Sequence, residues 1–266
     1  MKTIVINLAR ATERRARMEK QIAAQGLDAE FLLATDGRAL TADDRAMVNH
    51  AGRKCITPYP LTDNEVGCWQ SHRHAMMRVV ELGLPMVAIV EDDAVLAVDY
   101  GRVLTAVEQQ IDPAHFDVID LHRKFKKTEI FVACHPLLPG YAVGRVGYTH
   151  MGAIGYVVTR QGAERFLASA RQFDHAIDKA MHRYWANGLE LYGLEKPIVE
   201  HDDEGKSFVD ETRGQDRPQD RPRYPDANAL PWVVGRRLTR AYDSVMKRLA
   251  WPAYVRRGQR ALVPSK

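Results

Sequence analysis

A short apolar run that ends in three acids constrains the fold of this chain more than any other feature. Residues 86–90, Met-Val-Ala-Ile-Val, follow Pro85 and directly precede Glu91, Asp92 and Asp93. An uninterrupted apolar run of this length predicts a strand buried on both faces, since a strand with one wet face would alternate apolar and polar residues. Open α/β sheets bind ligands beyond the carboxyl ends of their strands, so the acids mark the expected site.

Strand and helix patterns alternate along residues 1–202. Helices are predicted after the first strand, over residues 62–82 behind a Thr-x-x-Glu capping box, after Thr159, and over residues 174–187. This alternation predicts an α/β fold with a mainly parallel, Rossmann-like sheet flanked by helices on both faces. The predicted strands cover residues 2–8, 30–34, 86–90, 116–121, 130–134, 153–159, 190–193 and 198–200.

The positive charge of the chain is concentrated at its C-terminal end. Residues 232–266 hold nine Lys or Arg and one acid, a charge of +8, and subtracting this from the net +4 leaves −4 for residues 1–231. Because the main part of the chain is therefore acidic, we do not expect it to bind nucleic acid.

The C-terminal quarter divides into two further predicted segments. Residues 203–231 are polar and proline-rich, which predicts an extended linker. Residues 232–266 predict a basic amphipathic helix, typical of segments that lie on an anionic membrane surface. A helix that docks onto the domain or onto a partner is the alternative. The apolar residues at helical spacing are Val234, Leu238, Ala241, Val245 and Leu249.

Other features bear on the cellular compartment. No apolar run approaches the roughly 20 residues of a membrane span, and the N-terminal run is too short for a secretory signal. The three cysteines, Cys55, Cys68 and Cys134, form no CxxC pair, which favours a reducing compartment. We therefore expect a cytoplasmic protein that associates peripherally with the inner membrane.

Cys68, beside Trp69, is expected to be a small buried filler and not a nucleophile.

The acidic triplet has the chemistry of a cation site. Glu91 and Asp93 lie two residues apart in an extended segment, so both side chains are expected to face one way while Asp92 faces another. Hard carboxylate oxygens suit Mn²⁺ or Mg²⁺ held jointly with substrate phosphates. Arg10 and Arg14, near the start of the first helix, would add positive charge. Solvated acidic and basic surfaces are the alternative for both groups.

Further residues are candidates for proton transfer and for metal binding. Asp174 and Asp178 would lie one turn apart in the predicted 174–187 helix, where either could accept a proton from a hydroxyl group, although an N-cap role for Asp174 is the alternative. His201 follows a predicted strand and is a candidate to complete the metal shell. A hydrogen-bonded surface histidine is the alternative there.

Five segments, in order, resemble glycosyltransferase family 25, the lipooligosaccharide galactosyltransferase group that is related to the collagen galactosyltransferases. A stretch at 201–203 departs from the expected pattern, as does the length of the proline-rich linker. The resembling segments span roughly residues 1–200: 6–10 (INLAR) with Arg14-Arg15, 34–37 (ATDG), 61–72 (LTDNEVGCWQSH), 90–94 (VEDDA), and Gly155-Tyr156 with 162–164 (GAE).

The resemblance implies an A-type glycosyltransferase fold for a catalytic domain over residues 1–202. It further implies a UDP-hexose donor, UDP-galactose by expectation, inversion at the anomeric carbon, and a lipopolysaccharide, lipooligosaccharide or other surface-glycan acceptor. We expect the donor to be bound by Asn7, Arg10, Arg14, Asp36, Ser71 and Asp92, the cation by Glu91, Asp93 and His201, and the proton to be accepted by one of Asp178, Asp174 and His72.

Two other functions compete with this interpretation. One is a non-catalytic module that binds a sugar nucleotide or a glycan on the same fold, but such a module would not need the Glu91 and Asp93 pair. The other is a carboxylate-metal phosphotransferase, which should carry an aspartyl nucleophile at a strand end with a partnering lysine. The sequence offers no such pairing, so the transferase remains the favoured hypothesis.

Overall fold

A single mixed sheet forms the centre of the computed structural model, which describes residues 1–122, 130–147, 152–202 and 222–261. The order of its eight strands is β2-β1-β3-β8-β5-β9-β7-β6. The strands are β1 Thr3–Asn7, β2 Ala29–Leu33, β3 Met86–Glu91, β5 Val118–Asp120, β6 Phe131–Leu138, β7 Tyr141–Val146, β8 Gly155–Thr159 and β9 Leu191–Leu194.

Most strands of this sheet run in the same direction. β1 is parallel to β2 and to β3, and β5 is parallel to β9. β8 lies antiparallel between β3 and β5, and β7 lies antiparallel between β9 and β6. The predicted parallel arrangement therefore holds for every strand of the sheet except β7 and β8, and the carboxyl ends of β1, β3 and β5 meet at one edge.

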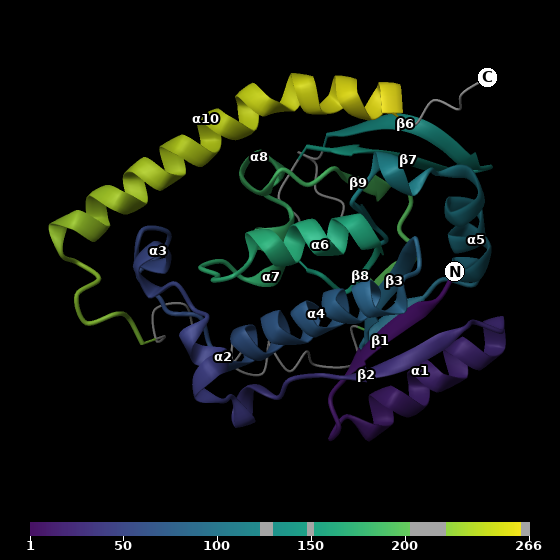
Figure 1. Ribbon diagram of the computed structural model, residues 1–266, viewed down its shortest axis with the longest axis horizontal. Helices are drawn as coiled ribbons and strands as arrows, with labels where there is room; N and C mark the ends of the chain where they lie inside the picture. The colour runs from purple at the N-terminus through teal and green to yellow at the C-terminus, as the bar shows by residue number, and fades with distance from the viewer. Residues whose placement is uncertain (123–129, 148–151, 203–221, 262–266) are drawn as a thin grey trace.

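Helices cover both faces of the sheet, as predicted. One face packs against α1 (Thr12–Gln25) and α5 (Tyr100–Gln110), and the other packs against α4 (Asp63–Leu82) and α6 (Arg160–Ser169). Figure 1 shows α4, α6 and the short α7 side by side. The remaining short helices are α2 Ala42–Ala46, α3 His50–Lys54, α7 Ile177–Met181, α8 Tyr184–Asn187, and the 3-10 turns η1 Gly37–Ala39 and η2 Pro113–His115.

Strand β3 and helix α4 form as their sequences predict. Val87 and Ile89 enter one hydrophobic cluster while Ala88 and Val90 enter the other, so β3 is buried on both faces. Helix α4 begins with a capping box in which the Thr62 side chain accepts from the N–H of Glu65, and it ends at Gly83 with φ 65°. Both boundaries follow from local chemistry, because a hydroxyl satisfies the first N–H groups and glycine tolerates the left-handed end.

The segment after the acids and the segment before β9 differ from the predictions. Residues 94–96 form a short strand, β4, which pairs antiparallel with β10 (Val199–His201) in a separate two-stranded sheet. The predicted helix over 174–187 is wrong as one element, because α7 ends at Met181 and α8 begins at Tyr184. Strand β7, which forms a hairpin with β6, and helix α5 were not predicted.

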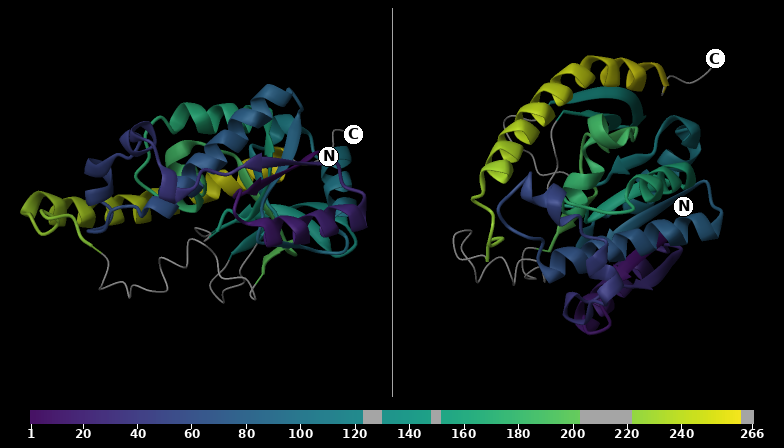
Figure 2. Two further views of the ribbon diagram at one scale, coloured as in Figure 1. Left: turned by 90° about the horizontal axis from the view of Figure 1, so that it is seen from below. Right: turned by 60° about the vertical axis from the view of Figure 1, so that its left-hand side comes forward.

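The C-terminal segment forms a 32-residue helix, α10 (Leu230–Ala261), with Pro252 inside it. Figures 1 and 2 show that it runs along the outside of the molecule, in yellow, from α3 to β6. Within the described residues, no helix has the length and apolarity that crossing a bilayer requires. Most of the predicted linker, residues 203–221, lies outside the described part of the chain, so its extended conformation stays a prediction.

Helix α10 is fastened to the body at both ends. Near its start, the Arg236 guanidinium donates to the carbonyl oxygens of Lys54 at 3.1 Å and Ala227 at 2.8 Å. Near its end, the Tyr254 ring covers the buried Arg145 guanidinium at 3.9 Å. The predicted alternative of a docked helix is thus realised along one side of α10.

The opposite side of α10 carries an exposed apolar stripe. Leu238 is 64% exposed and Leu249 is 69% exposed, and exposed arginines flank both. These are the apolar positions that the sequence placed at helical spacing. The stripe consists of Val234, Leu238, Ala241, Val245 and Leu249.

Candidate active site

A cleft of about 550 Å³ opens at the carboxyl ends of β1 and β3. It lies beyond the strand ends, where ligands bind in open α/β sheets. Residues from β1, α1, the loop after β2, helix α4 and the acidic triplet line it. The predicted site residues among them are Arg10, Arg14, Ser71, Glu91, Asp92 and Asp93.

Asp92 fastens the end of β3 to the loop after β1. Its Oδ2 accepts hydrogen bonds from Asn7 Nδ2 at 2.7 Å and from the N–H of Leu8 at 3.3 Å, and its Oδ1 accepts from Arg14 Nη1 at 3.2 Å. Burial raises the pKa of Asp92, and these donors oppose the rise. Asp92 therefore faces β1 and α1, where it shares the Arg14 guanidinium with Asp93.

Asp93 is a buried acid with one oxygen in need of a partner. Its Oδ2 lies 3.4 Å from Arg14 Nη1. Its Oδ1 is buried and accepts no hydrogen bond from the residues that the structure describes. Burial, followed by the negative charge of Glu91, raises the pKa of Asp93 to about 7, against the opposing charge of Arg14. A cation at this position would relieve both effects.

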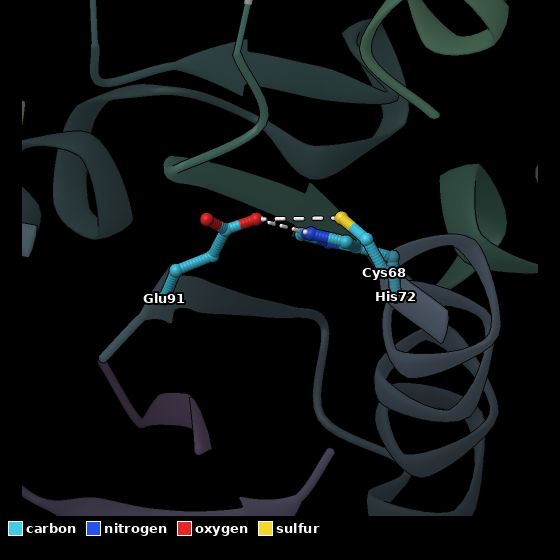
Figure 3. A group of neighbouring side chains, drawn as sticks. All are labelled: Cys68, His72 and Glu91. Carbon is cyan, nitrogen blue, oxygen red and sulfur yellow. Dashed lines mark hydrogen bonds and ion pairs between the residues drawn. The ribbon is translucent and has the colours of Figure 1, made fainter. Parts of the chain in front are cut away.

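Glu91 turns toward helix α4 and meets a histidine and a cysteine. Figure 3 shows the Glu91 carboxylate at the end of β3 pointing at Cys68 and His72. Glu91 Oε1 lies 2.9 Å from His72 Nε2 and 3.8 Å from Cys68 Sγ. Burial raises the pKa of Glu91, but the hydrogen bond and charge of His72 outweigh it and leave the pKa lowered.

His72 is placed to hold Glu91 and not to meet an acceptor sugar. Its side chain is fully buried, and its second ring nitrogen, Nδ1, lies 2.9 Å from the Tyr156 hydroxyl. Both nitrogens are thus engaged by the protein. The geometry does not support the predicted proton-accepting role of His72, because a base must reach the hydroxyl that it deprotonates.

Histidines and an aspartate from later in the chain approach the acids. His201 pairs with Ala94 across the β4–β10 sheet, and its ring lies 5.2 Å from that of His122. Asp178 Oδ2 accepts a hydrogen bond at 3.1 Å from the N–H of Gly152, which itself adjoins both histidines. The negative charge of Asp178 also helps raise the pKa of Cys68, after burial and Glu91. Asp178 and His201 therefore lie near the triplet.

Asp174 lies away from this group. It precedes helix α7, its Oδ1 is 2.5 Å from His175 Nδ1, and its carbonyl oxygen accepts from Arg53 at 3.1 Å. The predicted sharing of one helix face by Asp174 and Asp178 does not occur, because α7 begins only at Ile177. Nor does Asp174 cap that helix, since the N-cap residue is Ala176.

The loop after β2 forms a further wall of the cleft. Arg10 Nε donates to Asp36 Oδ2 at 2.9 Å, and this bond lowers the pKa of Asp36. Ser71 Oγ accepts from the N–H of Thr35 at 2.9 Å and donates to the Gly67 carbonyl at 2.7 Å. Ser71 thus fastens this loop to α4. Arg10 remains 28% exposed on the cleft side of the pair.

The predicted metal ligands do not converge as one group. Among the described residues, the side chains close enough to share an ion are Cys68, His72 and Glu91, whose ligand atoms lie within 4.8 Å of one another. Asp93 and His201 are neighbours of this group and not members of it. The sequence predicted Glu91 and missed the roles of Cys68, His122 and Tyr156, although the i, i+4 spacing of Cys68 and His72 was visible.

Comparison with known proteins identifies the family of this chain. The family model described as glycosyltransferase family 25 (LPS biosynthesis protein) matches residues 1–181, more than half of the chain. The chain belongs to glycosyltransferase family 25. All of the cleft-lining residues named above lie within the matched part of this family 25 chain.

The relatives of this family 25 chain come from bacteria and animals. The lacto-N-neotetraose biosynthesis glycosyltransferase LgtE of Neisseria meningitidis serogroup B is 24% identical over 232 residues, which cover 83% of this chain and 82% of LgtE. The inactive glycosyltransferase 25 family member 3 of Mus musculus is 33% identical over 218 residues, covering 73% of this chain and 36% of that protein. Procollagen galactosyltransferase 1 of Danio rerio is 29% identical over 172 residues, covering 61% and 28% respectively.

The chain spans about a third of the length of the two animal relatives. It spans most of the bacterial one. The cleft of this family 25 chain combines carboxylates and arginines in its lining, and the His72 imidazole lies against Glu91.

Proposed function

We propose that this family 25 chain is an inverting glycosyltransferase on an A-type glycosyltransferase fold. It would transfer a hexose, galactose from UDP-galactose, to a lipopolysaccharide, lipooligosaccharide or other surface-glycan acceptor. The observation that carries the proposal is the buried Asp93, whose Oδ1 accepts no hydrogen bond from the described residues beside a cleft lined by Arg10 and Arg14. The names of LgtE and of the procollagen galactosyltransferase support the choice of sugar and acceptor.

The residues beside the cleft fit a divalent cation. Carboxylate oxygens are hard ligands that Mn²⁺ and Mg²⁺ accept, and a cation would satisfy the Asp93 Oδ1 atom. Asp93 would hold it together with Glu91, and His201, whose charge acts on Glu91, is the candidate for a further ligand. When bound, such an ion stabilises the negative charge that builds on a departing diphosphate.

The remaining roles fall to side chains of the chain itself. Arg10, on the exposed side of its pair with Asp36, would bind donor phosphate, and the loop fastened by Ser71 would contact the nucleoside. Asp178 is the candidate that accepts the proton of the acceptor hydroxyl, because it lies near the triplet and is only partly buried, whereas His72 is fully buried and Asp174 lies away from the cleft. In an inverting reaction one such base suffices.

Measuring UDP release tests this proposal. Purified protein is incubated with a panel of UDP-sugars, with Mn²⁺ and then with EDTA. We expect release from UDP-galactose, loss of release with EDTA, and a decrease of at least about 100-fold in Asp93→Asn, since charge stabilisation at a leaving group contributes on this scale. Asp174→Asn is the matched control, because Asp174 lies outside the cleft, and it should release UDP at the wild-type rate.

The same assay separates the enzyme from a non-catalytic module on the same fold. One animal relative is named as inactive, so binding without turnover is a specific alternative. Binding of UDP-galactose by calorimetry, with no UDP released in the presence of any offered acceptor glycan or of water, would favour the binding module and contradict the transferase.

We also propose that α10 places the enzyme on the anionic cytoplasmic surface of the inner membrane. The exposed apolar stripe defined above would insert at the boundary between headgroups and acyl chains. Each flanking arginine would be attracted to anionic headgroups by about 1 kcal/mol. The ends of the helix are fastened to the body, so the stripe is presented outward without any rearrangement.

Vesicle co-sedimentation tests the membrane proposal. We expect binding to vesicles containing phosphatidylglycerol, little binding to phosphatidylcholine vesicles, and a decrease of at least about tenfold in binding for Leu238→Glu, which places a charge on the stripe. Val98→Glu is the control, because Val98 is 96% exposed on another part of the surface. Equal binding by both variants would remove the proposal.

A further inference from the structure

We propose that Cys68, His72 and Glu91 form a binding site for a thiophilic divalent ion, zinc, that shares only Glu91 with the carboxylate site. The three side chains bring one sulfur, one nitrogen and one oxygen within 4.8 Å of one another. Cys68 and His72 are four residues apart on α4, so they share one face of the helix, and Glu91 reaches them from the end of β3 (Figure 3).

The separations of the ligand atoms are close to those of a tetrahedral zinc site. Zinc binds thiolate sulfur at about 2.3 Å, imidazole nitrogen at about 2.0 Å and carboxylate oxygen at about 2.1 Å, which places the ligand atoms roughly 3.3 to 3.6 Å apart. Here Glu91 Oε1 lies 2.9 Å from His72 Nε2 and 3.8 Å from Cys68 Sγ. These two separations differ from the tetrahedral ones by a few tenths of an ångström, and the ligand atoms of Cys68 and His72 lie within 4.8 Å of each other.

The surroundings orient the histidine and leave a coordination position open. His72 Nδ1 lies 2.9 Å from the Tyr156 hydroxyl, which directs Nε2 toward Glu91, and such a partner raises the metal affinity of a histidine. Cys68 and Glu91 both line the cleft, whereas His72 is fully buried. A fourth ligand, water, would enter from the cleft side.

Binding follows a simple proton balance. The Cys68 thiol loses its proton to solvent as the sulfur bonds to zinc. With a neutral His72, the ring proton moves from Nε2 to Nδ1, and the Nδ1–H group then donates a hydrogen bond to the Tyr156 oxygen. The net change is one zinc ion bound and one proton released. A soft thiolate ligand favours zinc over Mg²⁺ and Mn²⁺, which prefer oxygen.

Occupancy of this site would inhibit the transferase. This step rests on the proposed function, because Glu91 would be a ligand in both sites and zinc would compete with the other cation for its carboxylate. Zinc at Cys68 and His72 would hold Glu91 against α4 and withdraw it from the donor diphosphate. The thiol in the cleft would then make the enzyme sensitive to zinc.

Cobalt titration of the full-length protein under reducing conditions tests the site directly. A cobalt ion bound to a thiolate absorbs in the near ultraviolet, and we expect this band in the wild type, its loss on addition of zinc, and its absence in Cys68→Ser. Cys134→Ser is the matched control and should keep the band, since Cys134 lies on β6. A wild type without the band, or Cys68→Ser with it, would overturn the proposal.

Tyr156→Phe tests the orienting contact and keeps the experiment informative if Cys68→Ser folds poorly. Because it removes only the hydroxyl that holds His72 Nδ1, it should retain the cobalt band with an affinity at least about tenfold lower. An unchanged affinity would contradict the geometry proposed for His72.

Activity measurements separate the failure of this site from the failure of the proposed function. We expect zinc to inhibit UDP release by the wild type and not by any residual activity of Cys68→Ser. A cobalt band in a protein that releases no UDP would leave the metal site standing and reject the transferase. An active enzyme without the band would reject the metal site alone.

Discussion

Three adjacent acids are tolerated because each lies beside a group that can offset its negative charge. Glu91 contacts His72, and Asp92 contacts Asn7 and Arg14. The same Arg14 guanidinium lies 3.4 Å from Asp93. Paired buried charges avoid most of the cost of isolated ones. The sequence predicted the place of the acids at the end of a buried strand. It could not predict these partners, since they come from residues far from the triplet along the chain.

A second buried pair predicts how stability depends on pH. His182 Nε2 lies 2.5 Å from Asp120 Oδ2, and Nδ1 lies 2.6 Å from the Asp178 carbonyl oxygen. Burial lowers the pKa of His182, but the Asp120 carboxylate outweighs it and raises the pKa from 6.5 to about 9. A raised pKa means that the pair stabilises fully below about pH 6.5 and that this contribution is lost as the pH rises through about 9.

Urea unfolding of the wild type and His182→Gln at about pH 6.5 and about pH 9.5 measures this contribution. We expect the difference in free energy of unfolding between the two proteins to shrink at the higher pH by up to about 3 kcal/mol, since one pKa unit corresponds to about 1.4 kcal/mol. Groups that titrate alike in both proteins cancel in that difference. A difference independent of pH would show that His182 is not held in its charged form.

At the scale of elements, local chemistry predicted where elements begin and end, and tertiary packing decided the rest. Helix α4 follows its capping box and its terminal glycine. The predicted 174–187 helix is interrupted because neighbouring residues serve other contacts: Phe173 stacks on Trp69 with ring centroids 4.2 Å apart, and His182 binds Asp120. Strand β4 depends on β10, about 100 residues later in the chain, so no local pattern indicates it, whereas β7 follows β6 in a hairpin whose turn lies at residues 139–140.

The contact between α4 and the loop after β2 makes Gly67 sensitive to substitution. A Cβ at Gly67 would lie 2.8 Å from the Thr35 carbonyl oxygen and 2.9 Å from the Gly37 nitrogen, both backbone atoms. We expect Gly67→Ala to push this loop outward, to destabilise the fold by about 1 to 3 kcal/mol, and to raise the KM for the donor several-fold.

Gly83→Ala serves as its control. Gly83 adopts φ 65° at the far end of the same helix, so alanine there should cost about 1 kcal/mol of stability with no change in donor KM. Measuring both quantities for both variants separates loss of stability from damage to the cleft. A donor KM that stays at the wild-type value in Gly67→Ala would argue against the loop as part of the donor site.

At the scale of the whole molecule, the α/β class and the site edge could be predicted, whereas the strand order could not. β8 inserts antiparallel between β3 and β5, although β5 precedes it in the chain. Such pairing depends on contacts over the entire sheet. The sequence also indicated the apolar stripe of α10 and offered docking of the helix as an alternative, but not the contacts that dock it, since Arg145 and Tyr254 are remote in sequence.

The two attachments of α10 have a geometric consequence. A tail hinged at one point would let the enzyme swing on its anchor, but a rod joined to the body at Arg236 and at Tyr254 cannot pivot. A bilayer bound along that rod would hold the cleft at one tilt and one height above the lipid phosphates. Acceptors would then be selected by how far their terminal sugar projects, so that the length of the glycan itself becomes a criterion of choice.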